Sequence, residues 1–148
     1  MIPIHGSCHC GNLAFDLDWP GEGASIAARA CTCTFCVKHG AVWTAHAGAS
    51  LRVRVADPRP TSSYAFGTGT ATFHVCARCG AVPFATSDID GNRYAVVNVN
   101  CFDDFDRRLL AAEPVSFDGE QEATRLARRA ARWIAHVTIA VADTTAPA

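Results

Sequence analysis

The chain has 148 residues, 49% of them hydrophobic and 18% charged, with a formal net charge of −1 at pH 7. This size predicts one domain with one core, and the near-neutral charge excludes a general field that attracts nucleic acid or an acidic membrane surface. The first ten residues lack a basic stretch followed by a long apolar run, and no 18 apolar residues are consecutive. We therefore expect a cytoplasmic protein that binds neither nucleic acid nor membranes.

Short strands are predicted where apolar and polar residues alternate along the chain. Residues 13–18 and 51–55 alternate in this way, and residues 94–99 form a more buried run. Stretches rich in glycine and proline separate these segments and predict turns. The chain is therefore predicted to be mainly β. We assign the large aromatic residues to its core: Trp43, Phe66, Phe73, Phe84 and Phe102.

One amphipathic helix is predicted near the C-terminus, from Glu120 to about Val137. Apolar residues recur there at intervals of three and four, and the opposite side carries Arg125, Arg128, Arg129 and Arg132. Surface helices commonly have such a charged side, so we favour a solvated arginine face over one that binds an anion. Residues 141–148 are predicted to form a frayed tail.

Seven of the eight cysteines fall into three short clusters. Structural disulfides rarely persist in a reducing cytoplasm, so these clusters indicate metal binding or redox chemistry rather than a disulfide framework. In chain order the clusters are Cys8-x-Cys10, Cys31-x-Cys33-x-x-Cys36 and Cys76-x-x-Cys79.

The first and third clusters are doublets that a glycine closes, as a metal knuckle requires. Residues two apart on a flat strand are about 6.6 Å apart, whereas two sulfurs on one tetrahedral Zn²⁺ lie under about 4 Å apart. The backbone must therefore bend at each doublet. Together the doublets predict one structural zinc site that joins the N-terminal segment to the middle of the chain, with the ligands Cys8, Cys10, Cys76 and Cys79.

The middle cluster offers three sulfurs on one short loop, with no glycine to close it. Three protein ligands and an open fourth position are typical of a catalytic zinc. A second structural zinc, with Cys101 or His39 as its fourth ligand, fits three cysteines equally well. We interpret Cys101 as a buried apolar thiol and His39 as a surface-loop residue. A redox pair of Cys33 and Cys36 is less favoured, since no strand followed by a helix is predicted around it.

These clusters carry a resemblance to a known family. Residues 6–11, 31–36 and 76–80, in this order and with these separations, resemble the glutathione-dependent formaldehyde-activating enzyme / centromere protein V family, as does the stretch 97–104. The resemblance implies a β-tent of packed antiparallel sheets in a single zinc-binding domain at residues 4–140. It also implies one zinc at Cys8, Cys10, Cys76 and Cys79 and a second at Cys31, Cys33 and Cys36.

The activity that the resemblance implies joins formaldehyde and glutathione into S-hydroxymethylglutathione. We therefore expect a zinc-dependent carbon–sulfur lyase or synthase for a thiol–aldehyde adduct, whose catalytic zinc takes the sulfur of a small thiol as thiolate. The alternative is a non-catalytic zinc-binding module for a protein partner. The family commonly has histidine where this chain has Thr32 and a basic residue where it has Val37. We expect thiol binding to survive these differences more readily than turnover of that adduct.

Overall fold

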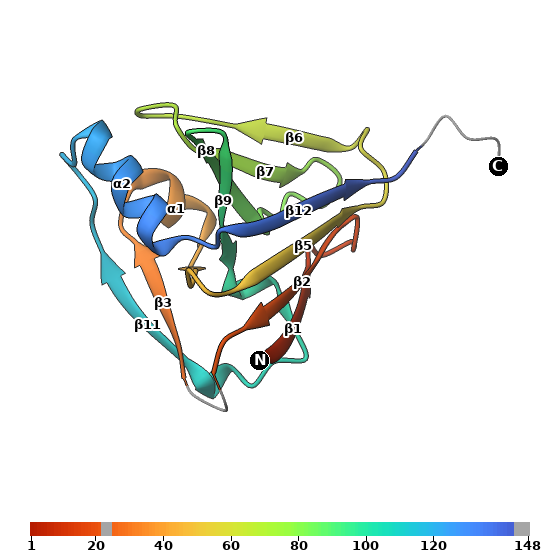
Figure 1. Cartoon of the computed structure of the whole chain (residues 1–148). Helices are drawn as coiled ribbons and strands as arrows, with labels where there is room; N and C mark the ends of the chain where they lie inside the picture. The colour runs from red at the N-terminus through yellow and green to blue at the C-terminus, as the bar shows by residue number, and fades with distance from the viewer. Residues whose placement is uncertain (22–24, 144–148) are drawn as a thin grey trace.

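Two β-sheets are the main secondary structure of the protein, a computed structural model that describes residues 1–21 and 25–143 (Figure 1). The mainly-β fold predicted from the sequence is confirmed. Five strands form the first sheet, in the order β10-β1-β2-β5-β12. They are β1 (Ile2–Ser7), β2 (Leu13–Trp19), β5 (Ser50–Val55), β10 (Phe102–Asp103) and β12 (His136–Val141).

Seven strands form the second sheet, in the order β11-β3-β4-β9-β8-β7-β6. They are β3 (Ile26–Cys31), β4 (Trp43–Thr44), β6 (Thr61–Tyr64), β7 (Thr72–Cys76), β8 (Phe84–Ile89), β9 (Asn92–Asn98) and β11 (Leu110–Val115). Neighbouring strands are mostly antiparallel, as expected, whereas β11 pairs with β3 and β12 with β5 in parallel. The C-terminal part of the chain thus adds one edge strand to each sheet.

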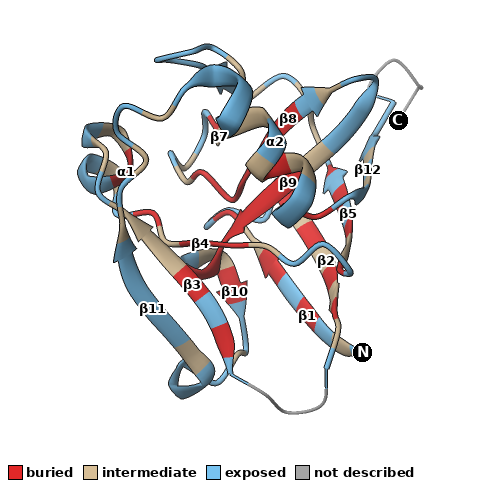
Figure 2. Ribbon diagram, turned by 60° about the vertical axis from the view of Figure 1, so that its left-hand side comes forward, coloured by how far each residue is buried: buried red, intermediate tan, exposed pale blue. Residues whose placement is uncertain are grey.

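Buried residues of both sheets form the main core, and Figure 2 shows the buried stretches of the strands in red. β2 and β5 pair antiparallel, and their buried residues alternate with more exposed ones, as the sequence pattern predicted. Phe84 and Val97 of the second sheet are buried in the same cluster. A smaller apolar cluster, which includes Trp43, Val96 and Trp133, packs on the second sheet near the two helices.

The helices are α1 (Thr34–His39) and α2 (Glu122–Arg132), and two short 3₁₀ turns span Val99–Cys101 and Arg107–Leu109. In Figure 2, α1 lies at the end of β3, and α2 lies apart from it, next to β8 and β9. Neither described helix has the length or the apolar run that a membrane crossing requires.

The predicted C-terminal helix is correct in type, but its predicted end at Val137 is wrong. α2 stops at Arg132, after which Ile134 exchanges two backbone hydrogen bonds of 3.0 Å with Ala95. The segment that follows is rich in β-branched residues, which favour a strand. Its pairing with β5 overrides the helical spacing. The strand reaches Val141, the first residue of the predicted tail, and residues 144–148 lie outside the described range.

Candidate metal centres

The first and third cysteine clusters lie in two turns with the same backbone pattern. Cys8 directly follows β1, and Cys76 is the last residue of β7. The N–H of Cys8 donates to the carbonyl of Leu13 (2.8 Å), and the N–H of Cys76 donates to the carbonyl of Ala81 (2.9 Å). Each turn therefore closes between a residue and the fifth one after it, and the predicted bend at each doublet is present.

The glycines of these motifs have two different roles. Gly11 and Gly80 follow the second cysteine of their turns with φ of +84° and +83°, a conformation that glycine adopts without strain. Gly6 is needed for space instead. A Cβ at this position would lie 2.2 Å from Cζ of Phe15 and 2.6 Å from the carbonyl oxygen of Cys101. The glycine before the first doublet thus permits close packing against the segment that leads into β10.

The two turns bring four sulfurs together, and we call Cys8, Cys10, Cys76 and Cys79 the four-sulfur group. The Sγ atoms of Cys8 and Cys10 are 3.7 Å apart, those of Cys10 and Cys76 are 3.5 Å apart, and all four lie within 4.8 Å of one another. Sulfurs bound to a tetrahedral zinc at about 2.3 Å are about 3.8 Å apart. These spacings fit a single tetrahedral metal ion.

The raised pKa of Cys8 is a second feature of this group that agrees with a bound cation. Burial raises the pKa of the Cys8 thiol to about 12, although the Leu13 N–H donates to its Sγ at 3.3 Å. A buried thiol of this kind ionises at neutral pH only where a positive charge stabilises the thiolate. The four-sulfur group can therefore hold a metal ion.

The four-sulfur group connects the two sheets. Two of its cysteines lie between β1 and β2 of the first sheet, and the other two lie at the turn from β7 to β8 of the second. Cys8 and Cys76 are buried in the main core. A cation bound here would fix the relative position of both sheets.

The middle cluster lies where β3 ends and α1 begins, and we call Cys31, Cys33 and Cys36 the three-sulfur group. Cys31 is the last residue of β3, and Cys33 is the N-cap of α1. The N–H of Cys36 donates to Sγ of Cys33 (3.4 Å), and the indole N–H of Trp43 donates to Sγ of Cys36 (3.3 Å). All three Sγ atoms lie within 4.8 Å of one another. This group can also hold a metal ion, with three protein ligands.

The strand and helix around this group correct one step of the sequence analysis. The sequence disfavours a redox pair of Cys33 and Cys36 because it predicts no strand followed by a helix there, yet β3 leads directly into α1. A six-residue helix is too short to show a clear helical period. Amides at a helix start can donate to a cysteine sulfur, as the N–H of Cys36 does to Sγ of Cys33. The third sulfur, from Cys31, distinguishes the group from a simple two-cysteine redox motif.

The thiols of the three-sulfur group differ in their tendency to ionise. A hydrogen bond with Cys36 lowers the pKa of Cys31 to about 5. The same interaction, together with burial, raises the pKa of Cys36. Cys31 is therefore the more acidic of these two thiols, whereas ionisation of Cys36 requires a cation.

Cys101 and His39, the proposed sources of a fourth ligand, lie outside both sulfur groups. Cys101 packs at the edge of the main core, and burial raises its pKa to about 11, in agreement with an apolar thiol. His39 is half-buried at the end of α1, with its ring 4.3 Å from that of Phe35. Its Nε2 has no hydrogen-bond partner in the described part of the chain. The surface-loop interpretation of His39 is therefore wrong.

The three-sulfur group lines a cavity of about 370 Å³, within the size range of small-molecule sites. Aromatic side chains form much of the wall, among them Trp43, Phe73 and Trp133. Phe66, from the turn between β6 and β7, also lines it and is 38% exposed, so its assignment to the core was wrong. The cavity gives the three sulfurs an open side toward a small molecule.

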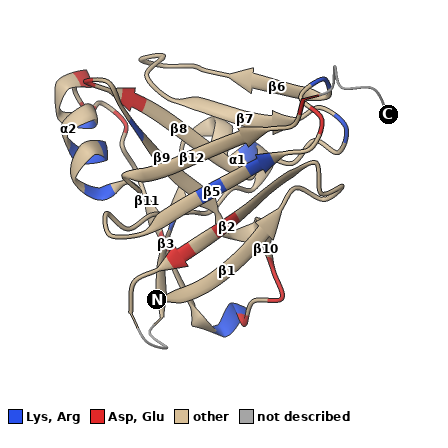
Figure 3. Ribbon diagram, turned by 45° about the vertical axis from the view of Figure 1, so that its right-hand side comes forward, with Lys and Arg blue, Asp and Glu red and all other residues tan. Residues whose placement is uncertain are grey.

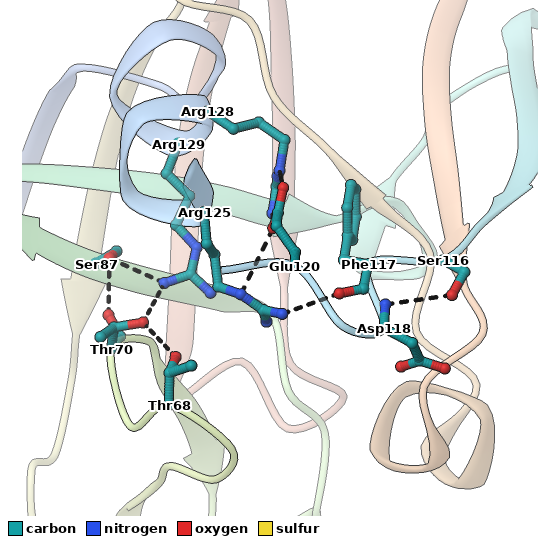
Figure 4. A network of polar contacts seen from close by, with 10 residues as sticks. All are labelled: Thr68, Thr70, Ser87, Ser116, Phe117, Asp118, Glu120, Arg125, Arg128 and Arg129. Carbon is teal, nitrogen blue, oxygen red and sulfur yellow. Dashed lines mark hydrogen bonds and ion pairs between the residues drawn. The ribbon is translucent and has the colours of Figure 1, made fainter. Parts of the chain in front are cut away.

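Four arginines complete the cavity wall, and we call them the arginine cluster: Arg29 from β3 and Arg125, Arg128 and Arg129 from α2. Figure 3 shows the basic residues along α2, and Figure 4 shows the three of this helix at close range. The predicted solvated arginine face is wrong, because Arg129 is only 6% exposed and Arg125 and Arg128 are half-buried.

The opposite side of α2 faces solvent. Ala123 and Ala127 of the predicted apolar side are exposed. Arg132, at the end of the arginine side, is exposed as well. Exposing a methyl group costs little, because the hydrophobic effect scales with apolar area. The helix can therefore turn its arginines toward a polar cavity. The sequence signal for this arrangement was the run of arginines itself, for which anion binding was the less favoured interpretation.

Comparison with known proteins agrees with the cysteine motifs. A family model for the glutathione-dependent formaldehyde-activating enzyme matches residues 3–117, which is 115 of the 148 residues. The chain belongs to this family. The resemblance carried by the three cysteine motifs is thereby confirmed, and the name of the glutathione-dependent formaldehyde-activating enzyme family associates this fold with formaldehyde and glutathione. Both sulfur groups lie inside the matched region, whereas α2 and β12 lie beyond it.

A solved structure is also similar to this member of the glutathione-dependent formaldehyde-activating enzyme family. It is the crystal structure of a Rhodobacter sphaeroides protein that was a structural genomics target. The two chains are 29% identical, and the match covers 70% of this chain and 92% of the other with a TM-score of 0.52. No curated protein matches the chain.

Proposed function

We propose that the protein is a zinc-dependent carbon–sulfur lyase or synthase for a thiol–aldehyde adduct. In this proposal the three-sulfur group holds the catalytic zinc, and the four-sulfur group holds a structural one. The observation that carries the proposal is the position of Cys31, Cys33 and Cys36 on the wall of a cavity large enough for a small substrate. The family's association with glutathione and formaldehyde supports the choice of substrates.

The proposed reaction forms or breaks one carbon–sulfur bond without oxidation or reduction. In the synthetic direction the thiol sulfur attacks the aldehyde carbon, the π bond of the carbonyl breaks, and the thiol proton passes through water to the oxygen. The reverse reaction releases the aldehyde. Zinc at the three-sulfur group would supply stabilisation of a substrate thiolate and polarisation of a carbonyl oxygen.

The chain's own residues contribute position and environment to this reaction. The indole N–H of Trp43 fixes the orientation of the Cys36 sulfur. The side chains of Trp43, Phe73 and Trp133 make this part of the cavity wall apolar, which would strengthen electrostatic interactions there. Substrate sulfur and aldehyde would meet between this wall and the cysteines, so that binding brings the reacting groups together.

Three further assignments belong to the same proposal. Residues 4–140 form the zinc-binding domain, and glutathione is the first candidate for the thiol. A cytoplasmic location follows from the free thiols that both sulfur groups need, because the cytoplasm keeps cysteines reduced.

Cobalt substitution tests the proposal against its alternative, a non-catalytic zinc module. Glutathione should change the visible absorption of the cobalt-loaded protein, because a new sulfur ligand alters the metal's coordination. Cys33→Ser should abolish this change in a protein that remains folded, whereas the control Cys101→Ala should keep it. Cobalt spectra that do not respond to glutathione or to smaller thiols would favour the non-catalytic module.

A second measurement identifies the substrate. Exchange between S-hydroxymethylglutathione and its components, followed by NMR, should be faster in the zinc-loaded protein than in buffer. Thr32 and Val37 stand beside the three-sulfur group in place of the family's usual histidine and basic residue. Thiol binding without this exchange would assign the site to a different thiol–aldehyde adduct.

A further inference from the structure

The arginine cluster has more positive charge than the protein itself neutralises. Glu120 forms ion pairs with Arg125 (3.5 Å) and Arg128 (3.0 Å). Asp118 is a further carboxylate at the cavity and is exposed. Four arginines against these two carboxylates and one thiolate charge of the three-sulfur group leave one positive charge in excess. Within residues 1–21 and 25–143, neither Arg29 nor Arg129 forms an ion pair with a carboxylate.

Arg129 is held in place by neutral groups. Its Nη1 donates to Oγ1 of Thr70 (2.8 Å) and to Oγ of Ser87 (3.3 Å), as Figure 4 shows. The side chain is 6% exposed, and its Nε has no hydrogen-bond partner among the residues described. Burial and the charges of Arg125 and Arg128 lower its pKa to about 10. A buried guanidinium with an unpaired donor on a cavity wall is costly unless an anion binds there.

Arg29 brings the positive charge close to the sulfurs. It lies on β3, two residues before Cys31, and lines the same cavity. The cluster therefore extends from the arginines of α2 to the strand that ends in the three-sulfur group.

We propose that the arginine cluster binds a carboxylate of the thiol substrate, so that the site selects small thiols that carry a carboxylate. A guanidinium donates two parallel hydrogen bonds to a carboxylate. The apolar aromatic wall would contact the carbon chain between the acidic group and the sulfur. This inference rests on the function proposed above and adds the substrate class. Three of the four arginines lie beyond the region that the family model matches.

Titration calorimetry on the zinc-loaded protein tests the inference with matched thiols. The pairs are 3-mercaptopropionate against 3-mercaptopropanol, and glutathione against its diethyl ester. The carboxylate member of each pair should bind at least about tenfold more tightly, because hydrogen bonds to a charged group are strong in a partly buried site. High salt should weaken binding of the carboxylate thiols more than that of the neutral ones.

Variants locate the effect. Arg129→Gln and Arg29→Gln should each reduce the preference for the carboxylate toward onefold, and Arg129→Lys should restore part of it. The control Arg52→Gln changes an exposed arginine of β5 that does not line the cavity and should leave the preference unchanged. Arg29→Gln keeps the test decisive if Arg129→Gln fails to fold.

The outcomes separate this inference from the proposed function. Equal binding of carboxylate and neutral thiols would overturn the inference and leave the proposed function standing. Failure of both kinds of thiol to bind would overturn the proposed function, and binding of succinate that depends on Arg129 would still support the arginine cluster as a carboxylate site. Tighter binding of 2-mercaptoethanesulfonate than of 3-mercaptopropionate, by more than about tenfold, would overturn the assignment to a carboxylate.

Discussion

The four-sulfur group takes its cysteines from turns in two different sheets, whereas the three-sulfur group takes its cysteines from one junction between a strand and a helix. Both groups have sulfurs at metal-binding distances from one another. The first group is part of the main core, and the second lies on the wall of a cavity beside four arginines. Identical ligand atoms can therefore serve structure or chemistry, depending on what surrounds them.

Because the four-sulfur group joins two sheets and the three-sulfur group lies in one segment, loss of a cysteine should destabilise the fold more in the first group than in the second. Cys76→Ser should remove most of the folding free energy, because metal binding between two sheets is coupled to folding and a domain of this size has only about 5–15 kcal/mol in total. Thermal unfolding followed by circular dichroism measures this. The matched variant Cys33→Ser should unfold close to the unsubstituted protein. If Cys76→Ser, Cys33→Ser and the unsubstituted protein unfolded at similar temperatures, the four-sulfur group would not support the fold.

Two glycine substitutions separate crowding beside the four-sulfur group from backbone strain beside the three-sulfur group. Gly6→Ala should lower the free energy of unfolding by about 1–3 kcal/mol, because its methyl group would overlap Phe15 and the Cys101 carbonyl. Gly40→Ala meets no atom within 4 Å but keeps φ at +70°, which costs about 1–2 kcal/mol. Denaturant titration measures both.

A second variant of the crowded site checks its cause. Replacing Phe15 by leucine in the Gly6→Ala protein should recover part of the loss, since the ring is one of the two obstacles. A Gly6→Ala protein as stable as the unsubstituted one would contradict the close packing around the first doublet.

The smallest predicted effect concerns the hydrogen bond from Trp43 to Cys36. Trp43→Phe keeps an aromatic ring and removes this donor, so the metal affinity of the three-sulfur group should fall by about tenfold. The affinity of the four-sulfur group should not change. Competition with a chromophoric chelator measures both affinities, and Trp19→Phe, a change at another buried tryptophan, is the control. If Trp43→Phe and Trp19→Phe changed the metal affinity of the three-sulfur group equally, the hydrogen bond to Cys36 would not contribute to metal binding.

Local sequence patterns predicted the parts of the fold that local geometry determines. β2 and β5 could be predicted because one side of each strand packs in the core and their side chains alternate. The two knuckles could be predicted because two cysteines bind one ion only at a bend, and Gly11 and Gly80 permit that bend. Both knuckles could be assigned to one metal site because two cysteine doublets supply the four ligands that a structural zinc requires.

Nonlocal packing explains what the sequence analysis missed. Helical spacing identifies which residues share a side of α2, but only the position of the cavity decides that Arg129 is buried while Ala127 is exposed. The end of α2 depends on pairing of β12 with β5, which is distant in sequence. The cavity is assembled from β3, the turn between β6 and β7, and α2, and no single segment carries a signal for it.

Stepwise removal of metal tests the division of roles between the two sulfur groups most directly. The protein loaded with two zinc ions is titrated with chelators of increasing strength while zinc release and circular dichroism are recorded together. Three ligands from one short segment close less of the coordination sphere than four from two segments. We therefore predict that one ion leaves first without a change in secondary structure, that Cys33→Ser lacks this ion, and that the second leaves with unfolding. Release of both ions in a single step with unfolding would contradict the account.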